Sequence, residues 1–293
     1  MKAPRMKEEL NPVITVKGVA GLGNRLFTLA YALDVAKQIS ARVEVDWSDG
    51  QIGPRGADLF SEYFECTESL NGVTSDWRVH SREGDYVLST FLTGLLTPLL
   101  RMGYVHSAEV WVSRHRRPYL ILPLELEAKL RKKQMTCAAH LPMIESVAQL
   151  HRIQLKDEVQ LRFDNSLPSD LAERIGVHVR HTDKRPKGDV HRLIERVKEE
   201  KVFLATDSAY IARLFRESCR DCVLVSTHLH DGNSSQGLHH LHFDTKLKRQ
   251  VFEEALIDMY ALSKTCLFLG QRNSSFSRVV SGRRNQVGVE FWS

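Results

Sequence analysis

The sequence contains few cysteines, and their number and spacing argue against a disulfide framework or a metal cluster. Five cysteines are an odd number in a chain of 293 residues, which is not the pattern of a disulfide-stabilised fold. Cys219 and Cys222 have C-x-x-C spacing, but no second pair follows, and a structural zinc site normally needs four ligands. We therefore expect reduced thiols and no metal or redox centre at this pair.

Long apolar runs are also missing. The longest nearly uncharged run, residues 86–100, contains Pro98 and falls short of the ~20 apolar residues that span a bilayer. The first residues carry charges where a signal peptide needs an apolar stretch. We therefore predict a cytoplasmic protein without a membrane span.

No strong excess of one charge distinguishes the chain. The 41 Lys and Arg against 36 Asp and Glu leave a formal net charge of +5 that is spread along the sequence. Such a charge suits an anionic small molecule as well as nucleic acid. The basic stretches at 114–117 and 131–133 accompany no recognised nucleic-acid module. Solvated helix faces are the favoured interpretation, and we expect no nucleic-acid partner.

The glycine turn near the N-terminus lacks the third glycine of a dinucleotide-binding motif. Gly21 and Gly23 are followed by Asn24, Arg25 and Leu26, whereas the motif requires G-x-G-x-x-G at the start of a helix. A nicotinamide-dependent dehydrogenase is therefore disfavoured. Two interpretations of the turn remain: Asn24 caps the following helix, or Asn24 and Arg25 face a cleft between two domains.

Strand and helix patterns alternate in both halves of the chain. Residues 13–16 and 43–46 have strand patterns and flank a helical pattern, which makes a βαβ unit. In the second half, helical segments separate most of five short apolar strands, at residues 175–180, 202–207, 222–226, 266–270 and 287–291. This alternation predicts parallel, doubly wound sheets.

We therefore predict an α/β protein with two facing Rossmann-like domains and a cleft between them. The segment 165–168 (Asn-Ser-Leu-Pro) marks the predicted boundary. It divides the chain into an N-terminal domain, residues 1–166, and a C-terminal domain, residues 167–293.

Polar residues gather after the predicted strands of the second half, where ligands of open α/β sheets bind. An arginine fork pairs with phosphate oxygens, and serine hydroxyls and N–H groups at a helix start receive further negative charge. Carboxylates repel phosphate and belong at the base or ribose, and one carboxylate matches the adjacent N–H donors of guanine. The set suits a diphosphate sugar, although any one member has a solvated loop or helix face as its alternative. The candidates are His178, Arg180, Asp183, Lys184, Asp207, Asp258, Ser274 and Ser275.

Histidines are concentrated between His228 and His242. Their partly alternating order is compatible with metal ligands on one strand face. The segment also holds the Gly, Asn, Asp and Ser residues typical of a loop, which is the favoured interpretation. The D-x-D motif that holds a metal-bound diphosphate in many glycosyltransferases is absent. We expect no metal and no other cofactor.

Several segments of the second half resemble the α1,6-fucosyltransferases. They are residues 176–184 (Gly-Val-His-Val-Arg-His-Thr-Asp-Lys), 202–207 (Val-Phe-Leu-Ala-Thr-Asp), 237–239 (Gly-Leu-His) and 258–263, followed by the pair Ser274 and Ser275. The glycine turn, residues 21–27, resembles the related α1,2-fucosyltransferases. The resemblance implies a GT-B architecture, inversion at the anomeric carbon, GDP-fucose as donor and no divalent metal.

The resemblance also implies roles for single residues. Arg180 would hold the β-phosphate, and Ser274 or Ser275 would contact phosphate. Asp207 and Asp258 would contact guanosine. The acidic residue that follows the family's lysine has no clear counterpart, and Asp189 is the candidate general base. Asp183 and Lys184 would order the loop after Arg180.

The function expected from residues and resemblance together is that of an inverting glycosyltransferase. It would move fucose from GDP-fucose to a glycan acceptor, with the nucleotide sugar bound by the C-terminal domain and the acceptor on the N-terminal side. Two alternatives remain: transfer of a different sugar from a different nucleotide, and a sugar-nucleotide-binding protein without catalysis.

Overall fold

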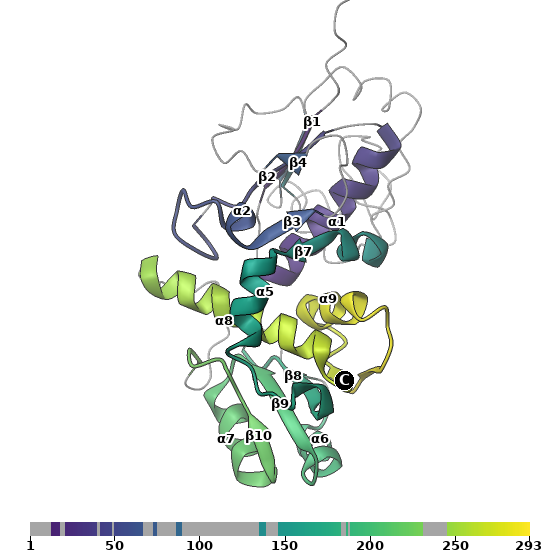
Figure 1. Ribbon diagram of the computed structural model, residues 1–293. Helices are drawn as coiled ribbons and strands as arrows, with labels where there is room; N and C mark the ends of the chain where they lie inside the picture. Colours follow the sequence, from purple (N-terminus) through teal and green to yellow (C-terminus); the bar gives the residue numbers. More distant parts are fainter. Residues whose placement is uncertain are drawn as a thin grey trace, which may run out of the picture.

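The computed structural model contains two parallel sheets, one in each half of the chain (Figure 1). It describes residues 13–17, 21–39, 42–48, 50–66, 73–74, 86–89, 135–138, 146–182, 186, 188–230 and 245–293. The basic stretches, most of the histidine segment, Asp183 and Lys184 lie outside these residues. The first sheet has the strand order β4-β2-β1-β6-β5, from β1 (Val13–Lys17), β2 (Arg42–Asp46), β4 (Val73–Thr74), β5 (Tyr86–Ser89) and β6 (Met135–Ala138).

The second sheet confirms the strand alternation predicted for the C-terminal half. Its order is β10-β9-β8-β11-β12, and all its pairings are parallel. The strands are β8 (Ile175–Val179), β9 (Lys201–Thr206), β10 (Asp221–Val223), β11 (Leu267–Gly270) and β12 (Val289–Phe291). β8, in the centre, reads as an almost continuous apolar run because its last four residues are buried. A third, antiparallel pair joins β3 (Phe64–Cys66) to β7 (Ile153–Leu155).

Helices cover both sheets, and some of them begin at side chains that cap their first turn. Asp189 accepts the N–H of His191 at the start of α6, and Ser208 accepts the N–H of Ile211 at the start of α7. The remaining helical elements follow the predicted periodicity or link the halves. The helical elements are α1 (Leu22–Ile39), α2 (Leu59–Tyr63), η1 (Ser146–Arg152), α5 (Asp157–Asp164), η2 (Leu171–Glu173), α6 (Val190–Val197), α7 (Ala209–Ser218), α8 (Thr245–Lys264) and α9 (Ser275–Arg283).

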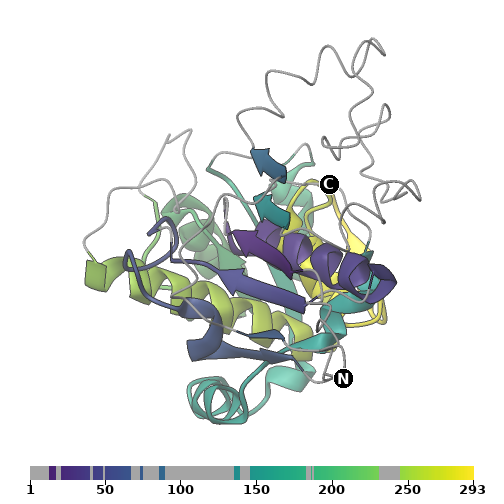
Figure 2. The same cartoon turned by 90° about the horizontal axis from the view of Figure 1, so that it is seen from above.

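Helices α8 and α9 lie between the two sheets and join them through one apolar core. Figure 1 shows both helices between the upper and lower sheets, and in the view from above α8 runs beneath the strands of the first sheet (Figure 2). Phe252 and Leu256 of α8 and Val279 of α9 belong to the same buried cluster as Leu26 and Val45 of the first half. This cluster contains residues from both sides of the boundary predicted between residues 166 and 167. The division of the chain into two domains therefore stays a prediction.

Polar contacts of α8 reinforce the link between the halves. The Nζ of Lys248 donates to the carbonyl oxygen of Gly50 at 2.7 Å, and the Tyr63 hydroxyl donates to Oε1 of Glu253 at 2.7 Å. A second cluster, which includes Val179, Leu204 and Phe215, packs the opposite face of the second sheet against α6 and α7. The second sheet is therefore buried on both faces.

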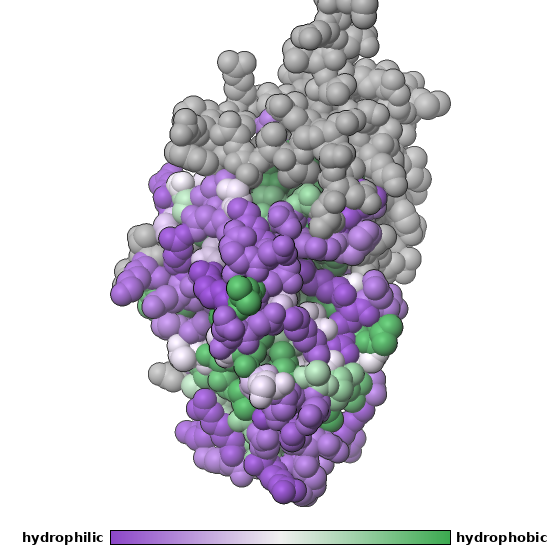
Figure 3. All heavy atoms as spheres, in the orientation of Figure 1, coloured by the Kyte–Doolittle hydropathy of each residue, from purple (hydrophilic) through white to green (hydrophobic). Residues whose placement is uncertain are grey.

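Hydrophilic residues cover most of the described surface on the face shown in Figure 3. Cys66, Cys219, Cys222 and Cys266 are free thiols. Burial raises the pKa of Cys222 to about 12 and also raises that of Cys219, so both thiols are poor nucleophiles at neutral pH. Within the described part of the chain, no helix combines the length and apolar character that a membrane crossing requires.

Candidate functional site

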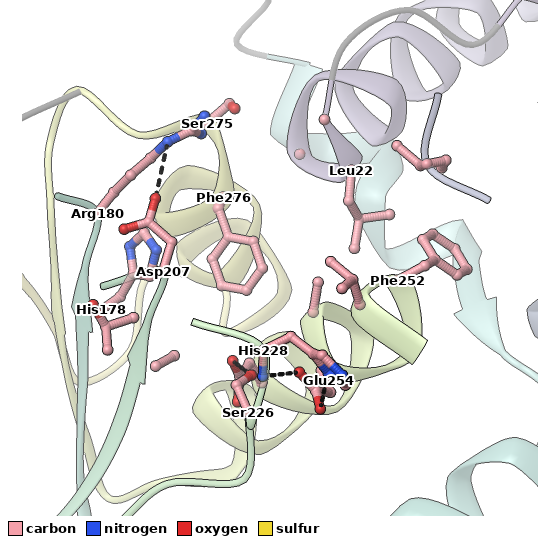
Figure 4. A pocket seen from close by; sticks show the side chains of 18 of the residues that line it. Leu22, His178, Arg180, Asp207, Ser226, His228, Phe252, Glu254, Ser275 and Phe276 are labelled. Atoms are coloured by element: carbon pink, nitrogen blue, oxygen red, sulfur yellow. Dashed lines mark hydrogen bonds and ion pairs between the residues drawn. The ribbon is translucent and has the colours of Figure 1, made fainter. Parts of the chain in front are cut away.

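A pocket opens between the two halves at the carboxyl ends of β8 and β9 (Figure 4). The first half contributes the turn at the start of α1 and two residues that follow β2. The second half contributes strand ends, the first turn of α9 and one face of α8. The pocket thus lies at the edge of the sheet where the sequence gathers its polar candidates. The lining residues used below are Gly21, Leu22, Gly23, His178, Arg180, Asp207, Ser226, His228, Glu254, Asp258, Ser275 and Phe276.

Arg180 follows the last residue of β8 and extends along one side of the pocket. Its backbone N–H donates to Oε1 of Gln271 at 2.8 Å, which fastens the strand end to the segment before α9. Its side chain is 15% exposed, and its Nε lies 3.9 Å from Oδ2 of Asp207. Figure 4 shows the guanidinium reaching toward Ser275. A charged fork in this position can bind an anion in the pocket.

The N-termini of α1 and α9 meet beside Arg180. A Cβ atom on Gly23 would lie 2.7 Å from the backbone nitrogen of Phe276 and 2.8 Å from the carbonyl carbon of Ser275. Only glycine permits this approach, because the obstructing atoms belong to backbone. The first N–H groups of a helix have no partner within the helix and carry partial positive charge. Two such N-termini next to an arginine form a site suited to phosphate.

Both residues of the serine pair are buried, but only Ser275 lines the pocket. Ser275 lines the pocket in the first turn of α9. Ser274 is fully buried at the N-cap position, and its Oγ has no hydrogen-bond partner among the residues that the structure describes. Of the two serines predicted to contact phosphate, the structure therefore places Ser275 in the pocket.

Asp207 directs its carboxylate toward the loop that carries Arg180. Oδ1 accepts the N–H of His181 at 2.8 Å, and Oδ2 accepts the hydroxyl of Thr182 at 2.6 Å. Asp207 also lines the pocket. Since both oxygens already accept hydrogen bonds from the loop, the carboxylate holds that loop against the end of β9.

Asp258 differs from Asp207, because only one of its two carboxylate oxygens accepts a hydrogen bond from a described residue. The carboxyl group is buried in α8; its Oδ2 accepts the hydroxyl of Ser226 at 2.6 Å, whereas Oδ1 accepts no hydrogen bond from any described residue. Burial raises the pKa of this carboxyl to about 7; the bond from Ser226 opposes the shift, and the charge of Glu254 adds to it. A buried acceptor without a donor is costly, and a ligand with N–H donors would remove that cost.

His178 and Phe276 form an aromatic wall between these groups. Their rings stack with centroids 4.7 Å apart, and His178 Nδ1 lies 2.6 Å from the hydroxyl oxygen of Ser277. Burial, together with the charge of Arg180, lowers the pKa of His178 to about 3. The imidazole is therefore neutral at physiological pH, and its role is packing and hydrogen bonding.

Besides Ser274, three predicted residues do not line the pocket. Asp189, the candidate base, is an exposed N-cap that accepts the N–H of His191 at 2.9 Å. Asn24 and Arg25 are buried in the first turn of α1, where Arg25 donates to Oε1 of Gln51 at 3.2 Å. Because α1 begins at Leu22, the interpretation of Asn24 as its N-cap is wrong. The alternative interpretation placed Asn24 and Arg25 at the cleft, but only Gly21, Leu22 and Gly23 of this turn line the pocket.

The sequence interpretation missed a second polar pair on the wall formed by α8. His228 Nδ1 lies 2.9 Å from Oε1 of Glu254, and both residues line the pocket. Glu254 precedes Asp258 by four residues, so the two carboxylates share one helix face. That spacing is the available signal, but the sequence interpretation weighs His228 only as a metal ligand or as part of a loop. No group of three or more His, Cys, Asp or Glu side chains is arranged to hold a metal among the described residues.

Comparison with solved structures identifies the fold. The NodZ α1,6-fucosyltransferase soaked with GDP-fucose aligns with a TM-score of 0.58 and 19% sequence identity, over 93% of this chain and 92% of that chain. NodZ from Bradyrhizobium aligns with a TM-score of 0.57, 19% identity and 92% of each chain. POFUT1 in complex with GDP-fucose aligns with a TM-score of 0.57, 11% identity and 99% of each chain.

The chain has the GT-B fold of these fucosyltransferases. This confirms the architecture predicted from the α1,6-fucosyltransferase resemblance. By sequence, no family model and no curated protein matches the chain. The pocket between the two halves of this GT-B chain is therefore the place to look for its activity.

Proposed function

We propose that the protein is an inverting fucosyltransferase that moves fucose from GDP-fucose to a glycan acceptor. The observation that carries the proposal is the polarity of the pocket. One end presents Arg180 and the N-termini of α1 and α9, and the other presents the buried Asp258 with one unpartnered oxygen among the described residues. A nucleoside diphosphate has matching polarity, with an anionic diphosphate at one end and a base at the other.

The phosphate end accounts for the diphosphate. The guanidinium of Arg180 binds two phosphate oxygens, and the N–H groups at the start of α9, beside Ser275, receive the remaining charge. Asp207 keeps the Arg180 loop in place through its bonds to His181 and Thr182. It contacts guanosine in the prediction from resemblance, but its hydrogen bonds favour this supporting role instead.

The other end accounts for guanine. The N1–H and the exocyclic amine of guanine are adjacent donors, and Oδ1 of Asp258 is a buried acceptor without a donor in the described part of the chain. Uracil and adenine do not present this pair of donors. The neutral His178 stacks on Phe276 and provides a flat apolar wall for the base. The solved neighbours NodZ and POFUT1 are described with GDP-fucose, which supports the same donor here.

In the proposed reaction an acceptor hydroxyl attacks the anomeric carbon of fucose as the bond from that carbon to the β-phosphate oxygen breaks. GDP leaves with the bonding electrons, and the configuration at carbon inverts. Charge on the β-phosphate rises toward the transition state, so Arg180 and the helix N-termini stabilise that state more than the bound donor. The hydroxyl proton passes to a base; Asp189, the candidate from sequence, caps α6 and does not line the pocket.

Titration calorimetry with GDP, UDP and ADP tests the donor class. A hydrogen bond to a charged group is worth about 1.5–3 kcal/mol, so we expect GDP to bind roughly 10-fold to 100-fold more tightly than the other two. Asp258→Asn should abolish this preference, and Glu253→Gln, at an adjacent carboxylate that does not line the pocket, should keep it. Equal affinities of the wild type for the three nucleotides would remove the case for GDP-fucose.

A donor-hydrolysis screen over purified nucleotide sugars distinguishes the enzyme from a binding protein. We expect slow release of fucose from GDP-fucose in the absence of acceptor. Tight GDP binding without hydrolysis or transfer, for any sugar tested, would favour the alternative of a sugar-nucleotide-binding protein without catalysis.

A further inference from the structure

The segment after β10 contacts α8 through a ladder of two hydrogen bonds, each of which ends on a carboxylate of the helix. Ser226 donates to Asp258 at 2.6 Å, and two residues later the backbone N–H of His228 donates to Oε2 of Glu254 at 3.1 Å. Alternate residues of an extended chain lie about 6.6 Å apart, and residues one helical turn apart are separated by a similar distance. Because the two spacings match, the pair Ser226–Asp258 and the pair His228–Glu254 lie on the same side of the pocket.

Glu254 fixes which nitrogen of His228 carries the proton. Its Oε1 lies 2.9 Å from Nδ1 of His228 and also accepts the hydroxyl of Thr227 at 2.6 Å. A carboxylate only accepts, so Nδ1 is the donor, and in the tautomer with a proton on Nδ1 alone, Nε2 is an acceptor. No described residue forms a hydrogen bond with this Nε2. His228 thus presents an oriented acceptor in a pocket where its side chain is 29% exposed.

The position of this acceptor decides between two uses. A carboxylate-oriented histidine can act as a general base toward an acceptor hydroxyl. However, a base must lie beside the anomeric carbon, which is bonded to the β-phosphate. Figure 4 shows Arg180 and Ser275 on one side of the pocket and His228, Glu254 and Ser226 on the other, with Phe276 between them. His228 therefore lies at the nucleoside end, beside the residue that receives the base.

We infer that His228 Nε2 accepts a hydrogen bond from a ribose hydroxyl of the bound nucleotide and that Glu254 is the residue that positions it. The inference rests on the proposed nucleoside diphosphate donor and adds a second point of recognition to Asp258. Asp258 is 5% exposed and contacts the buried base. His228 contacts Glu254, one helical turn before Asp258, and is more exposed, so we assign the ribose to it. The pocket then selects a ribonucleotide by two independent contacts.

Titration of GDP, 2′-deoxy-GDP and 3′-deoxy-GDP tests this contact directly. We expect one deoxy analogue to bind the wild type about 10-fold more weakly than GDP, the loss that corresponds to one hydrogen bond of ~1.4 kcal/mol. His228→Phe keeps the ring but removes Nε2, and should bind GDP and that analogue equally. Asp258→Asn should lose the preference for GDP over ADP while it keeps the ribose preference. His191→Gln, on the exposed face of α6, is the matched control and should keep both preferences.

Glu254 requires a measurement that a purely structural role would not affect. The ¹⁵N shifts of the His228 ring report its tautomer, and we expect the Nδ1–H form in the wild type and a changed tautomer ratio in Glu254→Gln. That variant should also lose part of the ribose preference, whereas Glu253→Gln should lose none.

Several results would overturn the inference. If both deoxy analogues bind the wild type as GDP does, or if His228→Phe keeps the wild-type preference, no ribose hydroxyl is recognised here. A fall in turnover by His228→Phe with unchanged nucleotide affinities would assign the pair to base catalysis instead. Absence of GDP binding to the wild type would instead refute the proposed function itself, which separates the two failures.

Discussion

Asp207 lies beside Arg180, with Oδ2 3.9 Å from the arginine Nε, while its two oxygens accept hydrogen bonds from His181 and Thr182. One carboxylate at the end of β9 thus lies beside the guanidinium of Arg180 and also accepts a hydrogen bond from the backbone of the loop that follows β8. This arrangement separates the tasks of two residues at the phosphate end: Arg180 faces the pocket, and Asp207 keeps it there.

Substitution of Arg180 should reduce turnover more than stability. Removal of one preorganised donor to a developing charge costs roughly 3–4 kcal/mol, so we expect Arg180→Ala to lower kcat by about 10²–10³. Arg180→Lys should not rescue activity, because an ammonium cannot span two phosphate oxygens. Asp207→Asn keeps one acceptor oxygen for the N–H of His181, and its amide can donate to the Thr182 hydroxyl, so it should have a smaller effect. Initial rates with GDP-fucose, together with circular dichroism of each variant, measure these effects.

The order of the three variants decides the role of Arg180. If Arg180→Lys keeps most of the activity and Asp207→Asn is as damaging as Arg180→Ala, then the ion pair serves only to hold the loop, and phosphate is bound elsewhere.

Asp258 should make the stability of the empty protein depend on pH. Burial raises its pKa from 3.8 to about 7, so between about pH 4 and pH 7 the native state keeps a proton that the unfolded chain releases. The free energy of unfolding therefore falls as pH rises through this window, by at most ~1.4 kcal/mol per pH unit. Asp258→Asn removes the titrating group, so its stability relative to the wild type should increase with pH. Urea denaturation of both proteins across the window measures the difference; a constant difference would show that Asp258 titrates normally.

Gly23→Ala should loosen the contact between α1 and α9. The added Cβ would meet the backbone of Ser275 and Phe276 at 2.8 and 2.7 Å, and such overpacking typically costs about 1–3 kcal/mol. GDP affinity should fall as well, since the two helix N-termini must move apart. Gly56→Ala is the control, because a Cβ there meets no atom within 4 Å and only the positive φ is strained. Unchanged GDP affinity in Gly23→Ala would mean that α1 does not contribute to the phosphate site.

Substitution of Asp189 distinguishes a role in capping α6 from a role in catalysis. Its side chain is 51% exposed and accepts the N–H of His191. Loss of an N-cap costs ~1 kcal/mol, so Asp189→Ala should lower the melting temperature slightly and leave turnover nearly unchanged. If turnover instead falls roughly 100-fold or more, the loss expected when a general base is removed, Asp189 takes part in the reaction.

Turnover should persist in EDTA. Arg180 and the N–H groups at two helix starts supply the positive charge that the leaving GDP requires. Activity that is abolished by chelation and restored by Mg²⁺ or Mn²⁺ would contradict this assignment of the phosphate site and return attention to the histidine segment.

The sequence by itself determined the alternation of strands and helices along the chain and the edge of the sheet where the pocket lies. The apolar runs between the helical segments predicted both ends of β8, β9 and β11 to within one residue. This is possible because burial of a central strand dictates its composition. The ends of parallel strands lie along one edge, so the sequence alone placed Arg180, Asp207 and Ser275 together.

Only the tertiary structure decided which of these groups is available to a ligand. Asp207 and Asp258 look alike in sequence, yet one has both oxygens bound by a neighbouring loop and the other has an oxygen without a described partner. Likewise, Asp189 is a capping residue, and Glu254 orients His228 from a separate element. The reason is physical: hydrogen-bond partners and burial are set by segments far apart in the chain, whereas strand and helix periodicity is written in neighbouring residues.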